Sequence, residues 1–211
     1  MKLELLDDRT VGEGGFLQLR RLRLRVVRED GTRTGEGLYD FVERPMGLDA
    51  VVLLLWSRTP DGVEVLLRQG LRVPLRFGRG QDAEHAPALF TELVAGIIES
   101  QDTDLRERAR AEALEEAGLS VDASAIKQLG PPMFPTPGMC AELFHLFSCE
   151  VNDSQRSAAV SPEGDGSPFE EGARTAWVPL DEALARCARG EIQDLKTELM
   201  LRRLREQLQL K

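Results

Sequence analysis

The segment AGIIESQDTDLRERARAEALEEAGLSV, residues 95–121, decides how this chain folds. Helix-forming residues run from about Leu105 to Ala117, and Gly118 follows them at the position where a helix commonly ends. The preceding FTELVAG, residues 90–96, predicts a short strand that runs into a glycine turn. The sequence therefore predicts a strand, a glycine turn and one helix in close succession.

Three glutamates, Glu112, Glu115 and Glu116, lie near the end of this helix. With Glu112 at 0°, helical geometry puts Glu116 at about 40° and Glu115 at about 60° in the other direction, so all three share one face. Two carboxylates about 6 Å apart repel by roughly 3 kcal/mol at an effective dielectric constant of 20. Such a face is either widely solvated or neutralised, and Mg²⁺ is a suitable partner because it binds carboxylate oxygens.

Composition indicates a globular protein with one substantial core. The chain has 211 residues, of which 42% are hydrophobic, and a formal net charge of −9. A chain this acidic lacks the broad cationic face that nucleic-acid or anionic-membrane binding requires. We therefore expect a small-molecule ligand, with neither nucleic acid nor membrane as a partner.

The cysteines and the N-terminus indicate a reducing compartment. Cys140, Cys149 and Cys187 are odd in number and form no CxxC pair, which predicts free thiols. The N-terminal MKLELLDDRTV carries acidic residues where a signal peptide would be apolar. The longest apolar run, residues 50–56, is far shorter than a membrane span. These features predict a cytoplasmic protein.

Strand-like and helix-like segments are mixed along the chain. Residues 1–45 alternate as a hairpin or meander and form an expected N-terminal β subdomain, followed by a main domain over residues 46–211. The fold class is α/β or α+β with a mixed sheet. In the main domain we predict strands at 48–56, 63–69, 126–135, 141–151 and 173–180, and loops at 70–89 and 152–168. Two late helices are predicted at 181–190, with Asp181 as N-cap and Gly190 as its stop, and at 194–210.

The opening segment resembles the Nudix box, G-x5-E-x7-R-E-U-x-E-E-x-G-U, where U is aliphatic. Gly96 matches the first glycine, and EALEEAGL, residues 112–119, matches the tail. The resemblance implies a Nudix hydrolase with an α/β/α sandwich, and a small N-terminal antiparallel sheet in addition. It further implies that helix glutamates, Glu112 and Glu116 above all, bind Mg²⁺ or Mn²⁺ for attack of water on a diphosphate.

The chain departs from the box at three points. Asp102 stands where the family has glutamate, and the chain is one residue longer before the helix tail. Ala111 stands where the family has an arginine that orients a neighbouring glutamate, and Arg110 lies about 100° away on the helix. These departures place the fine geometry of the site in question.

Further segments resemble the ADP-ribose pyrophosphatase branch of the family. VLLRQGLRVPL resembles a strand and loop that hold phosphates in that branch, and FTELVAGIIES resembles the entry to its box. PTPGMCAE resembles its substrate loop, and FEEG resembles its acidic loop. The resemblance implies a metal ligand at the Ala95 carbonyl and another at Glu171, with Glu170 or Glu163 assisting as base. It assigns substrate contacts to the following residues: Arg68, Arg72, Glu92, Gly96, Gly138 and Glu142, with Pro137 beside them.

The implied reaction is hydrolysis of ADP-ribose or a related nucleoside diphosphate sugar, carried out by a homodimer whose N-terminal subdomain helps to form the base site. The longer box and FEEG also resemble the UDP-sugar pyrophosphatases, which remain an alternative. A nucleoside triphosphate hydrolase would not need the N-terminal extension. A second alternative, a Nudix-fold binding module without catalysis, draws on Asp102 and Ala111, whereas the retained glutamates argue against it.

Overall fold

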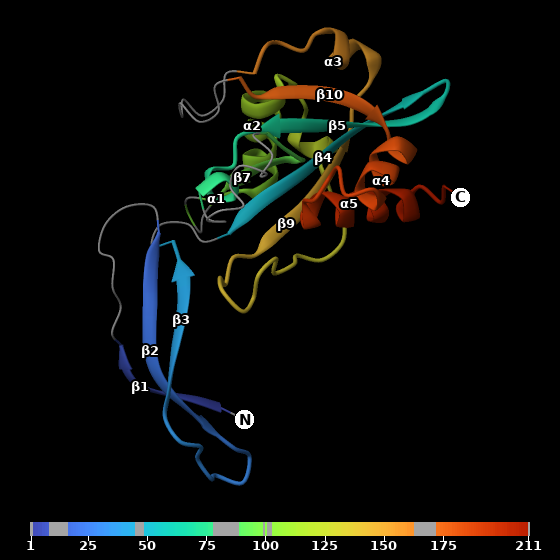
Figure 1. Cartoon of the computed structure of the whole chain (residues 1–211). Helices are drawn as coiled ribbons and strands as arrows, with labels where there is room; N and C mark the ends of the chain where they lie inside the picture. The colour runs from blue at the N-terminus through green and yellow to red at the C-terminus, as the bar shows by residue number, and fades with distance from the viewer. Residues whose placement is uncertain are drawn as a thin grey trace.

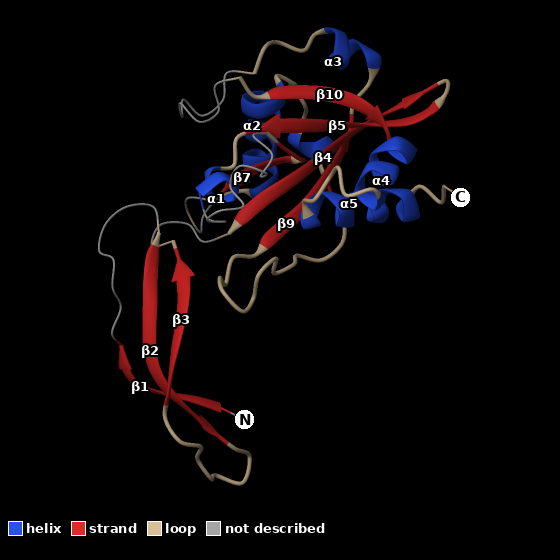
Figure 2. Cartoon of the chain, in the orientation of Figure 1, coloured by secondary structure: helices blue, strands red, loops and turns tan. Residues whose placement is uncertain are grey.

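The computed structural model describes residues 2–8, 17–44, 49–77, 89–98, 100, 103–162 and 172–210. Two sheets organise this part of the chain (Figure 1). A three-stranded antiparallel sheet comes from the N-terminal residues, and a seven-stranded sheet forms the centre of the main body. Helices lie on both sides of the larger sheet (Figure 2).

The N-terminal sheet has the order β1-β2-β3 and projects from the main body (Figure 1). Its strands are β1 (Lys2–Asp8), β2 (Gln18–Val27) and β3 (Gly37–Glu43). Arginines of β2 pair with acids of β3: Arg21 lies directly opposite Asp40, and Arg20 forms a diagonal ion pair with Glu43. The predicted N-terminal antiparallel sheet is confirmed.

The larger sheet is mixed, as predicted. Its order is β10-β5-β4-β9-β8, with β6 paired to β5 and β7 paired to β4. The central strand β4 runs parallel to β9 and antiparallel to β5 and β7. The strands are β4 (Ala50–Thr59), β5 (Gly62–Gly70), β6 (Phe90–Glu92), β7 (Val94–Ile97), β8 (Lys127–Gln128), β9 (Phe144–Glu150) and β10 (Arg174–Pro179).

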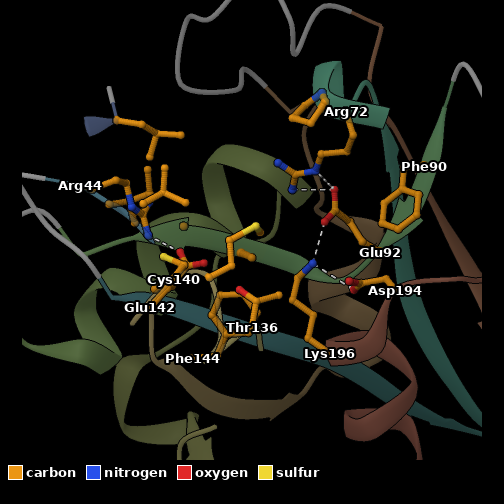
Figure 3. A pocket seen from close by; sticks show the side chains of 18 of the residues that line it. Arg44, Arg72, Phe90, Glu92, Thr136, Cys140, Glu142, Phe144, Asp194 and Lys196 are labelled. Carbon is orange, nitrogen blue, oxygen red and sulfur yellow. Dashed lines mark hydrogen bonds and ion pairs between the residues drawn. The ribbon is translucent and has the colours of Figure 1, made fainter. Parts of the chain in front are cut away.

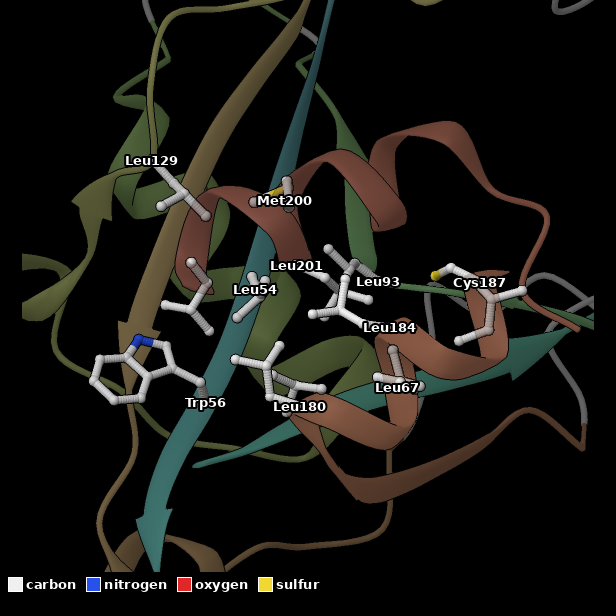
Figure 4. Close-up of a cluster of buried hydrophobic side chains, with 14 of the residues drawn as sticks. Leu54, Trp56, Leu67, Leu93, Leu129, Leu180, Leu184, Cys187, Met200 and Leu201 are labelled. Carbon is white, nitrogen blue, oxygen red and sulfur yellow. The ribbon is translucent and has the colours of Figure 1, made fainter. Parts of the chain in front are cut away.

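Strand β4 explains the layered architecture, because its side chains alternate between two cores. Val52, Leu54 and Trp56 pack with the helices α4 and α5 on one face (Figure 4). Val51, Leu53 and Leu55 pack with α2 on the other. The helices are α1 (Val73–Phe77), α2 (Leu105–Ala117), α3 (Asp153–Ser157), α4 (Leu180–Ala188) and α5 (Leu195–Gln207), with a 3₁₀ turn η2 (Ala123–Ala125).

The predicted α/β/α sandwich is therefore confirmed.

All three cysteines are free thiols, and burial raises the pKa of Cys149 to about 11. Among the described helices, none has the length and apolar character needed to cross a membrane.

Two segments predicted as loops contain short helices. Residues 73–77 form α1, in which Pro74 occupies the first turn, where proline is tolerated. Residues 153–157 form α3, which begins with a capping box between Asn152 and Gln155. The capping box thus stabilises a helix in residues 153–157, although the polar composition of this segment had predicted a loop.

Three other local predictions were wrong. Gly96 lies inside β7 rather than in a turn. The strand predicted at 126–135 is limited to β8, since Pro131 and Pro132 supply no N–H to a ladder. Asp181 lies in the first turn of α4, because the helix begins directly after β10 at Pro179, which offers no side-chain cap. Its negative charge is still favourable near the helix N-terminus.

Candidate active site

Helix α2 is fixed against the sheet by small residues. Ala109, Ala113 and Ala117 are fully or nearly fully buried in the core that α2 shares with β4. The Asp104 side chain caps the start of the helix, and Gly118 ends it with a left-handed φ of 66°. Because alanines allow close approach, the neighbouring glutamates are brought in against the sheet.

Glu112 is buried against the strand that precedes the helix. The residue is only 3% exposed, and its carboxylate lies over Gly96 of β7. A Cβ atom at position 96 would lie 1.4 Å from Glu112 Oε1 and 1.9 Å from Cδ. The box glycine therefore serves as a cradle for this carboxylate, since any side chain there would occupy its place.

Glu116 is held from two directions and is 7% exposed. Its Oε2 accepts a hydrogen bond of 2.9 Å from the backbone N–H of Ala95. Its Oε1 lies 3.3 Å from a guanidinium nitrogen of Arg68, which is itself 5% exposed on the interior strand β5. Of the two alternatives for the acidic face, wide solvation is thus excluded for Glu112 and Glu116, which are both buried.

The third glutamate has a different environment. Glu115 is half-exposed and lies 3.6 Å from Arg108, which also forms an ion pair with Glu112. Arg110 instead pairs with Glu107 on the outer side of the helix, at 2.7 Å. The prediction that Arg110 does not reach the other glutamates agrees with this pairing.

A pocket of about 540 Å³ borders the segment that contacts Glu112 and Glu116, since Ala95 and Gly96 belong to its lining, whereas the two glutamates themselves do not. Figure 3 shows the charged side chains around this pocket. The volume lies in the range of typical small-molecule sites. Residues from both sheets line it. They include Val42 of β3 and Arg44 directly after it, Phe90, Glu92 and Phe144 from the central sheet, Arg72, Pro74 and Leu75 around α1, Met139, Cys140 and Glu142 from the loop before β9, and Asp194 and Lys196 at the start of α5.

One wall of the pocket is a charge network centred on Glu92, which is 1% exposed (Figure 3). Arg72 Nε donates to Glu92 Oε1 at 2.7 Å, and Lys196 Nζ donates to Glu92 Oε2 at 2.7 Å. Lys196 also lies 2.9 Å from Asp194. Burial favours the neutral acid, yet these two cations outweigh it and hold the pKa of Glu92 below its ordinary value.

The opposite wall is a loop held by the N-terminal sheet. The Tyr39 hydroxyl donates to the Gly138 carbonyl at 3.1 Å, and the Val42 N–H donates to the Met139 carbonyl at 2.8 Å. Glu142 forms an ion pair with the buried Arg44. Burial raises the pKa of Glu142 despite that pair. The loop and the three-stranded sheet are thus joined at the pocket.

The donor set near Gly96 fits a hard divalent cation. The buried carboxylates of Glu112 and Glu116 both reach the Ala95–Gly96 segment, and all candidate donors are oxygens, as Mg²⁺ and Mn²⁺ prefer. Within the described ranges, no group of three or more His, Cys, Asp or Glu side chains is arranged around a common point. Mg²⁺ sites often use only one or two carboxylates plus substrate phosphates. The further candidates Glu163, Glu170 and Glu171, and also Asp102, lie outside the described residues.

Comparison with known proteins agrees with this geometry. A sequence profile of the NUDIX domain matches residues 50–198, which span the central sheet, α2 and the start of α5. The chain belongs to the Nudix family.

Nudix relatives match over nearly the whole chain. A GDP-mannose pyrophosphatase of Cronobacter sakazakii is 32% identical over 206 residues, covering 97% of this chain and 95% of the relative. A GDP-mannose pyrophosphatase of Citrobacter koseri is 30% identical over 202 residues, covering 95% and 93%. The crystal structure of an ADP compounds hydrolase superposes with a TM-score of 0.67 at 14% identity, covering 99% of this chain and 95% of that one. The expected Nudix pyrophosphohydrolase and its nucleoside-diphosphate-sugar branch are thereby confirmed.

Sequence reasoning missed three charged residues of this Nudix site. Lys196 and Arg44 join the pocket only through the tertiary fold, one from the last helix and the other from the N-terminal sheet. Arg108 could have been found, because it precedes Glu112 by four residues on the same helix.

Proposed function

We propose that this Nudix protein hydrolyses the diphosphate bond of a nucleoside diphosphate sugar with the help of a divalent cation. The observation that carries the proposal is the placement of Ala95 and Gly96. The same short segment touches the buried carboxylates of Glu112 and Glu116 and forms the wall of the 540 Å³ pocket. A diphosphate in the pocket would therefore lie beside the acidic helix.

The pocket supplies complementary groups for such a substrate. Arg72 and Lys196 place cationic groups on one wall, where they can approach phosphate oxygens by charge-assisted hydrogen bonds. Phe90 and Phe144 provide the apolar surface on which a nucleobase or sugar ring can pack. On the opposite wall, Glu142 and the Gly138 loop are placed to accept sugar or base hydrogen bonds.

We assign the cation to Glu112, Glu116 and the Ala95 carbonyl, with Glu171 as a further ligand and Mg²⁺ or Mn²⁺ as the ion. When bound, the ion supplies positive charge and Lewis acidity to the diphosphate. The protein groups act around it. Arg68 and the Ala95 N–H orient Glu116, Gly96 admits Glu112, and Glu170 or Glu163 takes a proton from water as it attacks phosphorus, with Glu115 assisting at the helix.

The reaction breaks one P–O bond of the bridge and forms one P–O bond to the water oxygen. A nucleoside monophosphate and a sugar phosphate leave. GDP-mannose is our first candidate, since the relatives from Cronobacter sakazakii and Citrobacter koseri, which match over nearly their whole length, carry that substrate in their names. ADP-ribose is the second candidate, from the resemblance of PTPGMCAE to the substrate loop of the ADP-ribose branch. UDP-sugars are the third.

We also propose that the protein works as a cytoplasmic homodimer. The N-terminal sheet projects from the main body (Figure 1). Leu19 and Leu38 share one face of this sheet and are exposed. A second copy packed on this face would bury both leucines, in line with an N-terminal role in base binding. Light scattering after gel filtration tests the proposal, with Leu38→Asp expected to yield a monomer.

Product analysis tests the reaction. Purified protein is offered GDP-mannose, ADP-ribose and UDP-glucose with Mg²⁺, with Mn²⁺ and with chelator, and nucleoside monophosphates are separated by ion exchange. Glu116→Gln should abolish release, whereas Glu107→Gln, on the exposed side of the same helix, should leave it intact. GMP release would establish the first candidate, and AMP or UMP release one of the others.

The rival proposal of a binding module without catalysis draws on Ala111, which removes the box arginine. It predicts that wild type and Glu116→Gln release no monophosphate from any of the three substrates while nucleotide sugars still bind. Calorimetric titration of the same samples would show that binding.

A further inference from the structure

A single arginine on α2 bridges two of the box glutamates. Arg108 forms an ion pair with Glu112 and lies 3.6 Å from Glu115 through its other terminal nitrogen. Its side chain is only 26% exposed, so the guanidinium is partly shielded from water. Ion pairs in such surroundings are screened less than surface pairs.

Helix geometry explains why this position can serve both acids. Residues four and seven positions after Arg108 lie at about 40° and 20° from it around the helix axis, so all three side chains form one stripe. Helical side chains lean toward the N-terminus, which brings Glu112 and Glu115 back over the turn that carries Arg108. A planar guanidinium can then hold two carboxylates at once.

The other basic position nearby does not share this stripe. Arg110 lies about 160° away from Arg108 and is engaged with Glu107. Ala111 carries no charge. Among the described helix residues, Arg108 is therefore the cation that separates Glu112 from Glu115, and without it the two carboxylates would repel each other across the stripe.

We propose that Arg108 is a positioning residue for the reaction, which holds the Glu112 carboxylate over Gly96 and fixes Glu115 beside it. This role is the one that the box arginine would have at position 111, supplied here from one turn earlier. The inference rests on the proposed hydrolysis, because its effect on rate can be measured only with a turning-over enzyme.

The experiment compares Arg108→Met with Arg110→Met, its matched control on the other side of α2. Methionine keeps the apolar stem and removes the charge. With the best substrate and saturating Mg²⁺, Arg108→Met should lower kcat at least tenfold and leave KM within threefold. Arg110→Met should change neither. Adding Ala111→Arg to Arg108→Met should return kcat to within threefold of wild type, because an arginine at position 111 lies four residues before Glu115, about 40° from it around the helix, and can pair with it.

A second readout needs neither metal nor substrate. Urea unfolding in chelator of wild type, Arg108→Met, Glu115→Gln and the double variant gives a double-mutant cycle. We expect a favourable coupling of at least threefold in the unfolding equilibrium constant. An unchanged kcat in Arg108→Met, or a double variant with Ala111→Arg that stays as slow as Arg108→Met, would overturn the positioning role. If wild type hydrolyses nothing, the proposed function fails, while the unfolding cycle still shows whether Arg108 holds Glu115.

Discussion

Substitution of Gly96 by alanine would test the link between the sheet and the acidic helix most directly. The new Cβ would lie 1.4 Å from Glu112 Oε1 and 2.7 Å from its Cγ, and ordinary contact begins near 3.4 Å. The carboxylate must therefore move by about 2 Å. Only the end of a flexible side chain is in the way, so the fold itself should survive the change.

The size of the effect follows from that displacement. Misplacement of a reacting group by about 1 Å can cost about a hundredfold in rate, so a shift of about 2 Å should lower kcat at least a hundredfold, which is about 2.7 kcal/mol of transition-state stabilisation. Replacing glycine by alanine restricts the unfolded chain and so stabilises the fold by about 0.4–1 kcal/mol. This offsets part of the stabilisation lost with the Arg108–Glu112 ion pair. The free energy of unfolding should then change by no more than about 2 kcal/mol.

The assay is release of nucleoside monophosphate at saturating Mg²⁺, with urea unfolding on the same preparations. Gly35→Ala is the control, because a Cβ there meets nothing within 4 Å, and it should leave kcat unchanged. A Gly96→Ala enzyme with kcat within threefold of wild type would refute the reasoning. It would mean that the position of Glu112 over Gly96 is immaterial to the reaction.

Three further outcomes are expected. Paired cations hold the pKa of Glu92 below 4.5, so its ion pairs stabilise the fold at higher pH and lose this effect as the pH falls. The difference in unfolding free energy between wild type and Glu92→Gln, measured by urea titration, should therefore shrink from pH 7 to pH 4. Arg44→Met leaves Glu142 without its ion pair and loosens the pocket loop, so steady-state kinetics should show KM rising by roughly threefold to tenfold with a smaller fall in kcat. Leu201→Ala, at a fully buried position of α5, should cost about 2–5 kcal/mol in the unfolding free energy, whereas the exposed Leu210→Ala should cost under about 0.5 kcal/mol.

Much of the fold was predictable because its signals are local. The apolar run in β4 predicted a strand, and the segment from Leu105 to Gly118 predicted α2 with its correct ends. At Gly96, by contrast, a contact distant in sequence explains the residue type. Gly96 lies in a strand, and it is glycine because Glu112, sixteen residues later, occupies the space of its side chain.

Burial of the acidic helix face could not be read from the helix alone. The same three glutamates on an isolated helix would be solvated, and their angular positions do not distinguish Glu115 from Glu112 and Glu116. The sheet makes the distinction, because it turns two of them toward β7 and leaves the third half-exposed.

Residue types and short spacings are enough to predict the family, the layered class, the acidic helix and most of the residues proposed for the site, since helix and strand geometry converts such spacings directly into positions. Which charged residues pair with one another depends on the packing of distant segments. Arg68 reaches Glu116 from β5, Lys196 reaches Glu92 from α5, and Arg44 reaches Glu142 from the end of the N-terminal sheet. These partners lie tens of residues apart in sequence, and no local rule brings them together. Packing of the sheet, the helices and the N-terminal strands does so, because a buried charge is stable only where the fold supplies its partner.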